Sequence, residues 1–317
     1  MSGQKIVVLG TGGTIAGTSA QAGDNIGYTA AQVGVEQLLT AVPGLQALAG
    51  GALVAEQVAQ IDSKDMDGEV WRTLALRCAP HLNDSEVGGV VITHGTDTLE
   101  ETAWFLHEVL DAAKPVVLTC AMRPATALTP DGPQNLLDAV ATVLAPGATG
   151  VLAVAAGEVH GARHVQKVHP YRVNAFSSGD AGPLGWVEEG VVRWACNSPV
   201  VQVNHAGSAM NNIVNAVAWP WVEIVMNHAG ASGRAVDVLV REGVQGLVVA
   251  CTGNGTIHQD LEAALVRAQN AGVRVVRSTR CAEGQVLPKP GDVLPASQGL
   301  SPVKARVALM LDLLRMH

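Results

Sequence analysis

Two short segments place hydroxyl side chains where a ligand would bind. Residues 7–17 read VVLGTGGTIAG and residues 90–98 read VVITHGTDT, so each is an apolar run that breaks into glycines and threonines. Such a run predicts a buried parallel strand whose carboxyl end lies at the edge of an open sheet, where ligands normally bind. In the second segment Thr96 is adjacent to Asp97, and a hydroxyl beside a carboxylate suits a site that holds an amine and a water molecule. We therefore predict that both segments supply threonines for chemistry.

The glycine loop of the first segment invites comparison with a dinucleotide-binding fingerprint. Ile15 stands where that motif needs its third glycine, and no helix of normal length follows, so NAD binding is disfavoured. Residues 18–27, TSAQAGDNIG, are small and polar and are typical of a mobile flap over a pocket. Two interpretations of Gly12 and Gly13 stay open: they turn the chain, or they let the backbone approach a ligand and offer amides to an oxyanion.

Asp97 also has a structural interpretation. Asp97 and Glu100 have the spacing of a capping box in front of a helical pattern over residues 98–112. A helix cap contributes about 1 kcal/mol to stability. It does not explain why Thr96 and Thr98 flank Asp97, so the functional interpretation stands beside the structural one.

Short β-branched runs alternate with helical patterns through the first half of the chain. Strands are predicted over residues 5–10, 89–93, 115–120 and 150–155. Helices are predicted over residues 36–42, 65–78, 98–112 and 133–144, with Pro133 at a favoured first-turn position. Each gap between strands admits a crossover helix, which is the pattern of a parallel sheet. Residues 168–208 are broken by glycine and proline and indicate hairpins and connecting segments.

The alternation resumes toward the C-terminus. Strands are predicted over residues 222–226, 246–251 and 272–277, and helices over residues 231–243, 259–270 and 302–316. We predict an α/β protein with a larger N-terminal, doubly wound, mostly parallel sheet domain and a smaller C-terminal flavodoxin-like α/β domain. The predicted boundaries are 1–195 for the catalytic domain, 196–220 for a linker and 221–317 for the smaller domain.

Composition narrows the classes of partner and location. The 317 residues are 48% hydrophobic, which is enough to bury a core without disulfides or metals. A net charge of -8 with scattered Lys and Arg argues against nucleic acid. The five cysteines form no CxxC pair and are expected to be mostly buried, reduced thiols, and the ten histidines show no metal-binding grouping. No apolar run reaches the roughly 18 to 20 residues of a membrane span.

The N-terminal sequence bears on location. Residues 1–5, MSGQK, lead directly into the first predicted strand and leave no room for a signal peptide. We therefore expect a cytoplasmic protein, or a periplasmic one if the natural chain is longer at this end.

The threonine segments belong to a longer series of motifs. The chain carries, in this order, TGGTIAG at 11–17, IDSKDM at 61–66, THGTDTLEET at 93–102, AMRP at 121–124, DGPQNL at 131–136, GNG at 253–255, VVRS at 275–278 and PVKAR at 302–306. The series resembles the bacterial L-asparaginases of the asparaginase/glutaminase family. The similarity runs almost from end to end, and both threonine motifs are highly specific in this order.

The resemblance implies a two-step hydrolysis of a side-chain amide through a covalent acyl-enzyme, with no cofactor and no metal. It makes Thr14 the nucleophile and Tyr28, on the flap, its assistant, since a threonine hydroxyl is a weak nucleophile at neutral pH. It also implies a second catalytic group of Thr96, Asp97 and Lys167, in which a buried lysine with a lowered pKa takes a proton through Thr96 and water. From the residues alone Lys167 is an exposed surface lysine.

The resemblance also implies how substrate is recognised. The carboxylate of Asp97 suits an α-amino group, and Ser63 with nearby amides suits an α-carboxylate, whereas spacing alone makes Ser63 the N-cap of a helix from Asp65. At Lys64 the secreted family members commonly carry glutamine, so this charge tightens the carboxylate end of the pocket or narrows it. The remaining substrate-binding residues that the resemblance implies are Gly13, Asp62, Gly95, Ala121 and Asn254.

The family's assembly gives a further expectation. The resemblance implies a homotetramer built as a dimer of dimers, in which Asn254 completes a pocket across the intimate dimer contact, and an isolated protomer should be inactive. Spacing alone makes Asn254 a left-handed turn residue. Secreted members supply a glutamate from the neighbouring subunit after the segment that matches residues 277–280, and the stretch that follows here is shorter, so no residue is assigned to that glutamate.

These observations lead to one hypothesis and several rivals. The leading hypothesis is hydrolysis of L-asparagine to L-aspartate and ammonia. A glutaminase-asparaginase of broad amide specificity is the enzymatic alternative. An amino-acid sensor that binds without cleaving is the alternative from another class, since a sheet edge can hold a ligand without catalysis. A nucleotide-binding oxidoreductase is the last rival.

Overall fold

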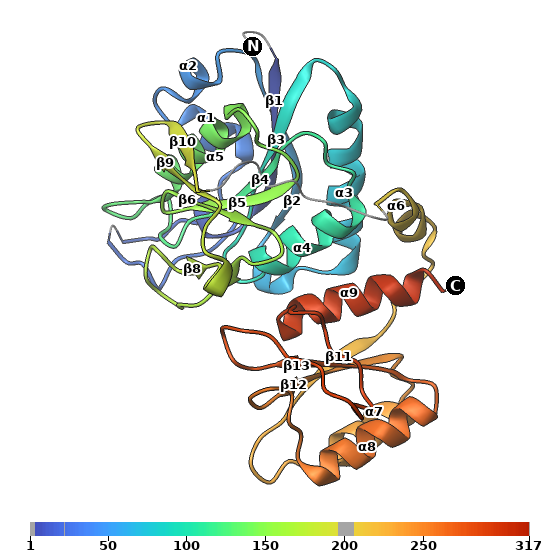
Figure 1. Ribbon diagram of the computed structural model, residues 1–317. Helices are drawn as coiled ribbons and strands as arrows, with labels where there is room; N and C mark the ends of the chain where they lie inside the picture. Colours follow the sequence, from blue (N-terminus) through green and yellow to red (C-terminus); the bar gives the residue numbers. More distant parts are fainter. Residues whose placement is uncertain (1–3, 22, 196–205, 317) are drawn as a thin grey trace. The chain divides into compact units, whose positions relative to one another are not determined.

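The computed structural model describes residues 4–21, 23–195 and 206–316, and the chain divides into two compact units, Met1–Gly207 and Ser208–His317 (Figure 1). Among these residues the larger unit holds an eight-stranded sheet and the smaller unit a three-stranded sheet. The predicted α/β fold, with a larger, mostly parallel sheet followed by a smaller parallel one, is confirmed. Of the predicted linker, residues 196–205 lie outside the described residues, and the rest includes helix α6 (Ala206–Asn215).

The larger sheet has the strand order β10-β9-β6-β5-β4-β3-β1-β2. Its strands are β1 (Lys5–Gly12), β2 (Leu53–Ile61), β3 (Val87–Thr93), β4 (Val116–Thr119), β5 (Val151–Ala155), β6 (Glu158–Gly161), β9 (Gly185–Glu188) and β10 (Val191–Trp194). Five neighbouring strands, in the order β2, β1, β3, β4 and β5, pair in parallel. Beyond β5, the strands β6, β9 and β10 continue the sheet in antiparallel fashion.

The order of the parallel strands determines where a ligand can bind. Strand β1 lies between β2 and β3. After β1 the chain therefore forms β2 on one side of it and then β3 on the opposite side. Such a reversal leaves a crevice outside the carboxyl ends of the two central strands. Strands β1 and β3 end next to each other, with Gly10 in register with Thr93. The fold therefore brings the two threonine segments to the same crevice.

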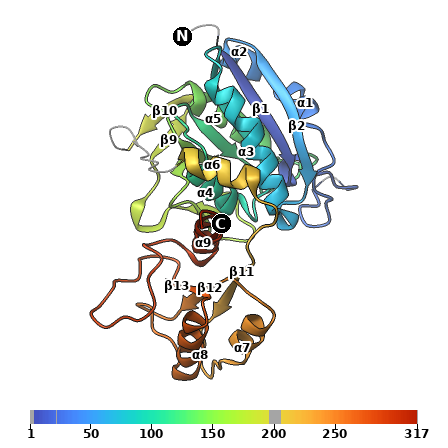
Figure 2. The same cartoon turned by 90° about the vertical axis from the view of Figure 1, so that its right-hand side faces the viewer.

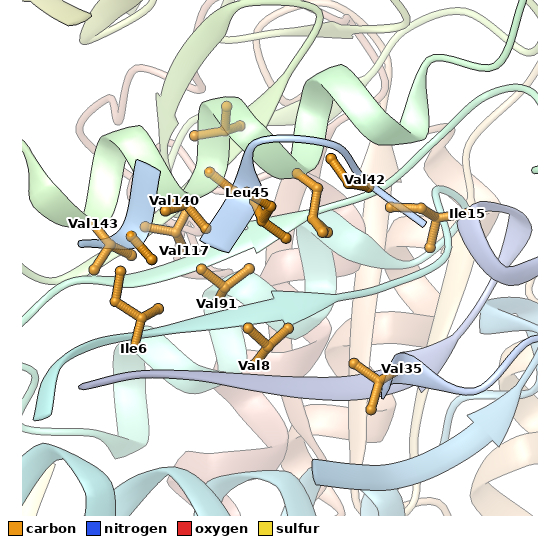
Figure 3. Close-up of a cluster of buried hydrophobic side chains, with 14 of the residues drawn as sticks. Ile6, Val8, Ile15, Val35, Val42, Leu45, Val91, Val117, Val140 and Val143 are labelled. Carbon is orange, nitrogen blue, oxygen red and sulfur yellow. The ribbon is translucent and has the colours of Figure 1, made fainter. Parts of the chain in front are cut away.

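Helices cover both faces of the larger sheet. Helices α1 (Val35–Thr40), α2 (Leu45–Ala49) and α5 (Gly132–Leu144) cover one face, and α3 (Gly68–Asn83) and α4 (Leu99–Val109) pack on the other. Figure 3 shows Val8, Val91 and Val117 of the strands facing Val140 and Val143 of α5. Because successive strand residues point to opposite faces, the intervening residues are buried too, and the strands need to be apolar throughout.

The smaller unit also has a parallel sheet covered by helices, here with three strands. Its parallel sheet has the order β11-β12-β13, formed by β11 (Val222–Met226), β12 (Gly246–Cys251) and β13 (Arg274–Thr279). Helices α7 (Arg234–Arg241) and α8 (Gln259–Asn270) lie on one face, and α9 (Pro302–Leu314) lies on the other (Figures 1 and 2). Apolar residues of α7 and α8 form one buried cluster with this sheet.

The sequence-based elements and the structure agree closely, with two omissions in the larger sheet. The four strands predicted in the first half correspond to β1, β3, β4 and β5, but β2 and β6 were not predicted. The interpretation of residues 168–208 as hairpins is confirmed where they are described, because β9 pairs with β10. A second hairpin joins β7 (Gln166–Lys167), which lies just before this stretch, to β8 (Phe176–Ser177).

The cysteines and the helices bear on the remaining expectations. Cys78, Cys120 and Cys251 are buried free thiols, as predicted, whereas Cys281 is exposed and Cys196 lies outside the described residues. Burial raises the pKa of Cys251 to about 11. In the part of the chain that the structure describes, no helix is both long and apolar enough to span a bilayer.

Candidate active site

The first site loop turns sharply after β1 because two glycines adopt conformations that other residues avoid. Gly12 and Gly13 have φ angles of 102° and 80°, and Thr14 then begins a 3₁₀ helix, η1 (Thr14–Ala16). A Cβ on Gly13 would lie 2.3 Å from the Cα of Gly95. The glycine thus permits backbone contact between the two site loops, since any side chain there would separate them.

Of the two interpretations left open for this loop, the structure does not support an oxyanion donor at Gly13. Its N–H donates to the carbonyl of Ile61 at 2.9 Å, so the donor is used to hold the loop against β2. The alternative of a dinucleotide-binding loop is not supported either. That motif needs a helix that starts in the glycine loop, but here only η1 follows, and the first α-helix begins at Val35.

The second site loop follows β3 and contacts the first. Gly95 lies against Gly13 on one side, and a Cβ on Gly95 would lie 2.4 Å from Ser63 Oγ on the other. Thr14 and Thr96 each directly follow one of the two touching glycines, and they are only 7% and 5% exposed. The two threonines are therefore brought into one neighbourhood by glycine backbone packing.

Thr14 is hydrogen-bonded to Tyr28. The distance between Thr14 Oγ1 and the Tyr28 hydroxyl is 2.7 Å. Tyr28 reaches this position because the chain doubles back between Thr18 and Thr29, whose backbones exchange hydrogen bonds of 2.9 and 2.8 Å. The pair supplies what a weak hydroxyl nucleophile requires, a polarising group in direct contact.

Lys167 joins the second loop from a separate hairpin. Its ammonium donates to Thr96 Oγ1 at 2.8 Å and to Asp97 Oδ1 at 2.6 Å. The Lys167 side chain is 16% exposed, so the interpretation as an exposed surface lysine is wrong. The physical reason is that β7 runs directly beside the second loop, where the Asp97 carboxylate compensates the ammonium charge. The arrangement can hold a water molecule or move a proton at Thr96.

The capping-box interpretation of Asp97 is also wrong. Helix α4 begins at Leu99 with Thr98 as its N-cap, and no side chain caps it. The Asp97 carboxylate binds Lys167, and Glu100 accepts the backbone N–H of Lys167 at 3.1 Å. Both acidic side chains are thus turned toward the lysine hairpin. Sequence reasoning gave Glu100 no role at the site, although its place one turn after Asp97 was a signal that could have suggested one.

Ser63 lies beneath the second loop and does not cap a helix. It is 2% exposed, its Oγ accepts the N–H of Asp97 at 3.2 Å, and its carbonyl accepts the Thr98 hydroxyl at 2.7 Å. Helix α3 is capped instead by Asp67, which accepts the N–H of Val70. Ser63 therefore fixes the position of Asp97 from below.

Asp62 and Lys64 flank Ser63 in a short 3₁₀ helix, η2 (Ser63–Asp65). Asp62 caps this helix by accepting the N–H of Lys64 at 3.4 Å. The Lys64 ammonium pairs with Asp65 and is largely exposed, and this hydrogen bond raises the pKa of Lys64. Lys64 is therefore a cation at the rim of the site and is free to change partner at little cost.

His94 and Ala121 complete the surroundings of the loops. His94 is fully buried, its Nδ1 bonds to the Gly95 carbonyl at 2.7 Å, and desolvation lowers its pKa to about 4. Ala121 follows β4, the neighbour of β3, and is 1% exposed. Its loop is tied down by the Asp131 carboxylate, which accepts the N–H groups of Met122 and Arg123, each at 2.9 Å. Among the described residues no cluster of His, Cys, Asp and Glu could hold a metal ion.

Asn254 lies in the smaller unit. Its Oδ1 accepts the N–H of Leu287 at 2.7 Å and its Nδ2 donates to the Leu287 carbonyl at 3.2 Å. The interpretation as a left-handed turn asparagine is wrong, because the positive φ angles of this turn belong to Gly253 and Gly255. Glycine takes these positions without steric cost, so Asn254 is left with an ordinary backbone and a side chain bound to the neighbouring loop.

Comparison with known proteins identifies the relatives of this chain. The family profile described as "Asparaginase, N-terminal" matches residues 5–199, and that described as "Glutaminase/Asparaginase C-terminal domain" matches residues 221–316. An L-asparaginase 2 of Escherichia coli is 39% identical over 97% of this chain and 88% of its own length. A glutaminase-asparaginase of Pseudomonas fluorescens is 38% identical over 97% of this chain and 86% of its own length. The crystal structure of a probable cytoplasmic L-asparaginase from Campylobacter jejuni superposes with a TM-score of 0.91 at 39% identity, covering 98% of this chain and 95% of that one.

Proposed function

The chain belongs to the asparaginase family, and from that premise we propose that it hydrolyses the side-chain amide of L-asparagine to L-aspartate and ammonia. The observation that carries this proposal is that two threonines on touching loops are each hydrogen-bonded to a different polar side chain. Thr14 is bonded to Tyr28, and Thr96 is bonded to Lys167. One pair serves to form an ester and the other to hydrolyse it.

In the first step the Thr14 hydroxyl attacks the amide carbon. A bond forms between Oγ1 and that carbon, the proton of Oγ1 passes toward the Tyr28 oxygen 2.7 Å away, and the carbonyl becomes an oxyanion. When the oxyanion collapses, the C–N bond breaks, the nitrogen receives the proton that left Thr14 by way of the Tyr28 hydroxyl, and ammonia leaves. The product is a β-aspartyl ester on Thr14.

In the second step water cleaves this ester. Thr96 Oγ1, held by Lys167, accepts a hydrogen bond from the water and so directs the water oxygen at the acyl carbon. The water oxygen bonds to the acyl carbon, the bond between that carbon and Thr14 Oγ1 breaks, the proton of the water passes to Thr14 Oγ1, and aspartate is released.

Recognition of the substrate uses groups beside these two pairs. Asp97 Oδ1 already holds one ammonium, that of Lys167, and the carboxylate is about half exposed, so it can accept the substrate's α-amino group as well. Ser63, Asp62 and Lys64 lie next to Asp97 through the bond from Asp97 N–H to Ser63 Oγ. We assign the substrate α-carboxylate to this segment, where the Lys64 charge attracts it.

Removing either hydroxyl tests the proposal. Thr14→Ala and Thr96→Ala should each lower kcat for L-asparagine by at least about 10³-fold, because each removes a group that acts only in the reaction. Ammonia release measures the rate, and the melting temperature checks the fold. Thr73→Ala is the control, since Thr73 lies on the exposed surface of α3, where its hydroxyl donates to the Glu69 carbonyl. Near-wild-type ammonia release from both site variants would rule out the proposal, and saturable asparagine binding without any aspartate would favour a sensor.

A glutaminase-asparaginase of broad specificity is the second candidate, because a relative of that description is as similar to this chain as the L-asparaginase. Lys64 is the residue to test. Replacing it as Lys64→Gln removes the positive charge at the carboxylate end and should shift the ratio of kcat/KM for L-asparagine to that for L-glutamine by several-fold, since the longer substrate must fit the same rim. An unchanged ratio excludes Lys64 as a selector.

Family likeness also supports proposals about assembly and location. We propose a cytoplasmic homotetramer built as a dimer of dimers, with a catalytic domain over 1–195, a linker over 196–220 and a smaller domain over 221–317. In this assembly Asn254 completes a site across the intimate dimer contact. Sedimentation equilibrium measures the assembly, and a fully active monomer would contradict it.

A further inference from the structure

The hairpin that carries Lys167 is short. Strands β7 and β8 have two residues each and form a sheet of their own. On the β8 side Ala175 and Phe176 are buried, whereas Tyr171 at the turn is 59% exposed. The strand with Lys167 is held by its partner strand and by the bonds of Lys167 itself to Thr96, Asp97 and Glu100, and the closure of the turn decides how the two strands meet.

His169 closes this turn with its side chain. Its Nδ1 accepts the backbone N–H of Tyr171 at 3.0 Å and the backbone N–H of Arg172 at 2.9 Å. The backbone N–H of His169 donates to the Ala175 carbonyl at 3.2 Å, and the backbone N–H of Val168 donates to the same carbonyl at 2.8 Å. The imidazole thus has the role that an Asp or Asn oxygen often has in a turn.

Accepting two N–H groups specifies the state of the ring. Only the neutral imidazole with its hydrogen on Nε2 has a lone pair on Nδ1, and the protonated ring is a donor at both nitrogens. Protonation would place a hydrogen on Nδ1 against two other donors and break both contacts. A turn closed in this way depends on pH, which an asparagine turn does not.

We infer that His169 is a positioning residue for Lys167: the neutral ring closes the turn and so holds the lysine between Thr96 and Asp97, and protonation of the ring loosens that hold. The inference rests on the proposed function, because the role of Lys167 belongs to it. The charged groups that the described contacts bring to the hairpin are Lys167 and Arg172 of the hairpin itself and Asp97 and Glu100 of the facing loop and helix α4. Within the described residues His169 forms no ion pair, so no carboxylate offsets the charge that the ring gains.

Two variants of His169 separate positioning from a merely structural role. His169→Asn keeps a neutral acceptor at every pH, and His169→Leu keeps bulk without an acceptor. At pH 8 we expect wild type and His169→Asn to have equal kcat, and His169→Leu to be slower by about tenfold with a nearly unchanged KM, since two ordinary hydrogen bonds are lost. Between pH 8 and pH 5 the kcat of wild type should fall toward that of His169→Leu, more steeply than that of His169→Asn. The control is His228→Asn, an exposed histidine of the smaller unit.

Hydrogen exchange tests the hairpin without reference to activity. The amides of Tyr171 and Arg172 should exchange faster in His169→Leu than in His169→Asn at pH 8, and at pH 5 the wild type should approach His169→Leu. Parallel acid limbs of kcat for wild type and His169→Asn would overturn the inference, as would changed exchange without changed kcat. These results differ from failure of the proposed function, which appears as activity in Thr14→Ala while the exchange pattern remains.

Discussion

Two glycines determine the geometry of the site as much as the side chains that react. A Cβ on Gly13 would lie 2.3 Å from the Cα of Gly95, so any larger residue pushes the loops apart. Thr14 and Thr96 follow these glycines directly, and a misplacement of about 1 Å can cost about 10²-fold in rate. The threonines were predictable from their motifs. The contact between positions 13 and 95 was not, because it arises only when β1 and β3 pair.

His94 links the site to the stability of the fold. Desolvation lowers its pKa from 6.5 to about 4, so the folded protein keeps the ring neutral. Below pH 6.5 the unfolded chain binds a proton that the folded chain does not, and stability therefore falls as the pH is lowered through this window. The loss from this single group reaches roughly 3 kcal/mol by pH 4.

Urea unfolding between pH 4.5 and pH 7.5 measures this effect. The wild type should lose stability more steeply toward low pH than His94→Asn, which can still donate to the Gly95 carbonyl. His228→Asn should keep the wild-type slope. If His94→Asn and the wild type have the same slope, the buried histidine is not the origin of the acid sensitivity.

Spacing along the chain makes two of the proposed site residues candidate helix caps, and neither of them caps a helix. Ser63 and Asp97 precede helices at plausible distances, but the Ser63 hydroxyl binds the N–H of Asp97 and the Asp97 carboxylate binds Lys167. Spacing along the chain reports only local partners. Both residues have partners more than thirty positions away, which only the pairing of the strands brings within reach.

At the scale of elements, continuous apolar runs were predicted well and mixed runs were not. Strands β1, β3, β4 and β5 are covered on both faces and so are apolar throughout, which marks them in the sequence. Strand β2 lies at the edge of the sheet and contains Glu56 and Gln57. Gln57 bonds to the N–H of Val35 at 2.8 Å and to the Gly10 carbonyl at 3.1 Å, so its polar side chain makes tertiary contacts. Such polar residues interrupt the apolar pattern by which a strand is recognised in the sequence.

The lysine hairpin shows the same limit in a shorter element. Two-residue strands carry no periodic signal, and a lysine in such a stretch is ordinarily solvated. Lys167 was assigned to the site only through the family resemblance. Its contacts with Thr96 and Asp97 show how the hairpin brings the ammonium to the second loop, and His169 closes the turn of that hairpin.

At the scale of the whole molecule, the alternation of strands and helices was sufficient to predict two α/β units and their order. Thr14, Tyr28, Thr96 and Lys167 all belong to the larger unit, so both hydrogen-bonded pairs of the proposed mechanism come from a single fold. Asn254 belongs to the smaller unit and is the residue whose role depends on the proposed assembly. Chain patterns cannot reveal such an arrangement, since a site shared between subunits leaves no periodicity in either.

Trapping the covalent intermediate tests the role of Thr14 most directly. Enzyme quenched during turnover of L-asparagine should carry a β-aspartyl ester, found by mass spectrometry on the peptide that contains Thr14. Thr96→Ala should accumulate this ester, because it retains the nucleophile and loses the group that delivers water, and Thr14→Ala should carry none. An ester on Thr96, or steady aspartate formation by Thr14→Ala, would contradict the assignment of Thr14 as the nucleophile.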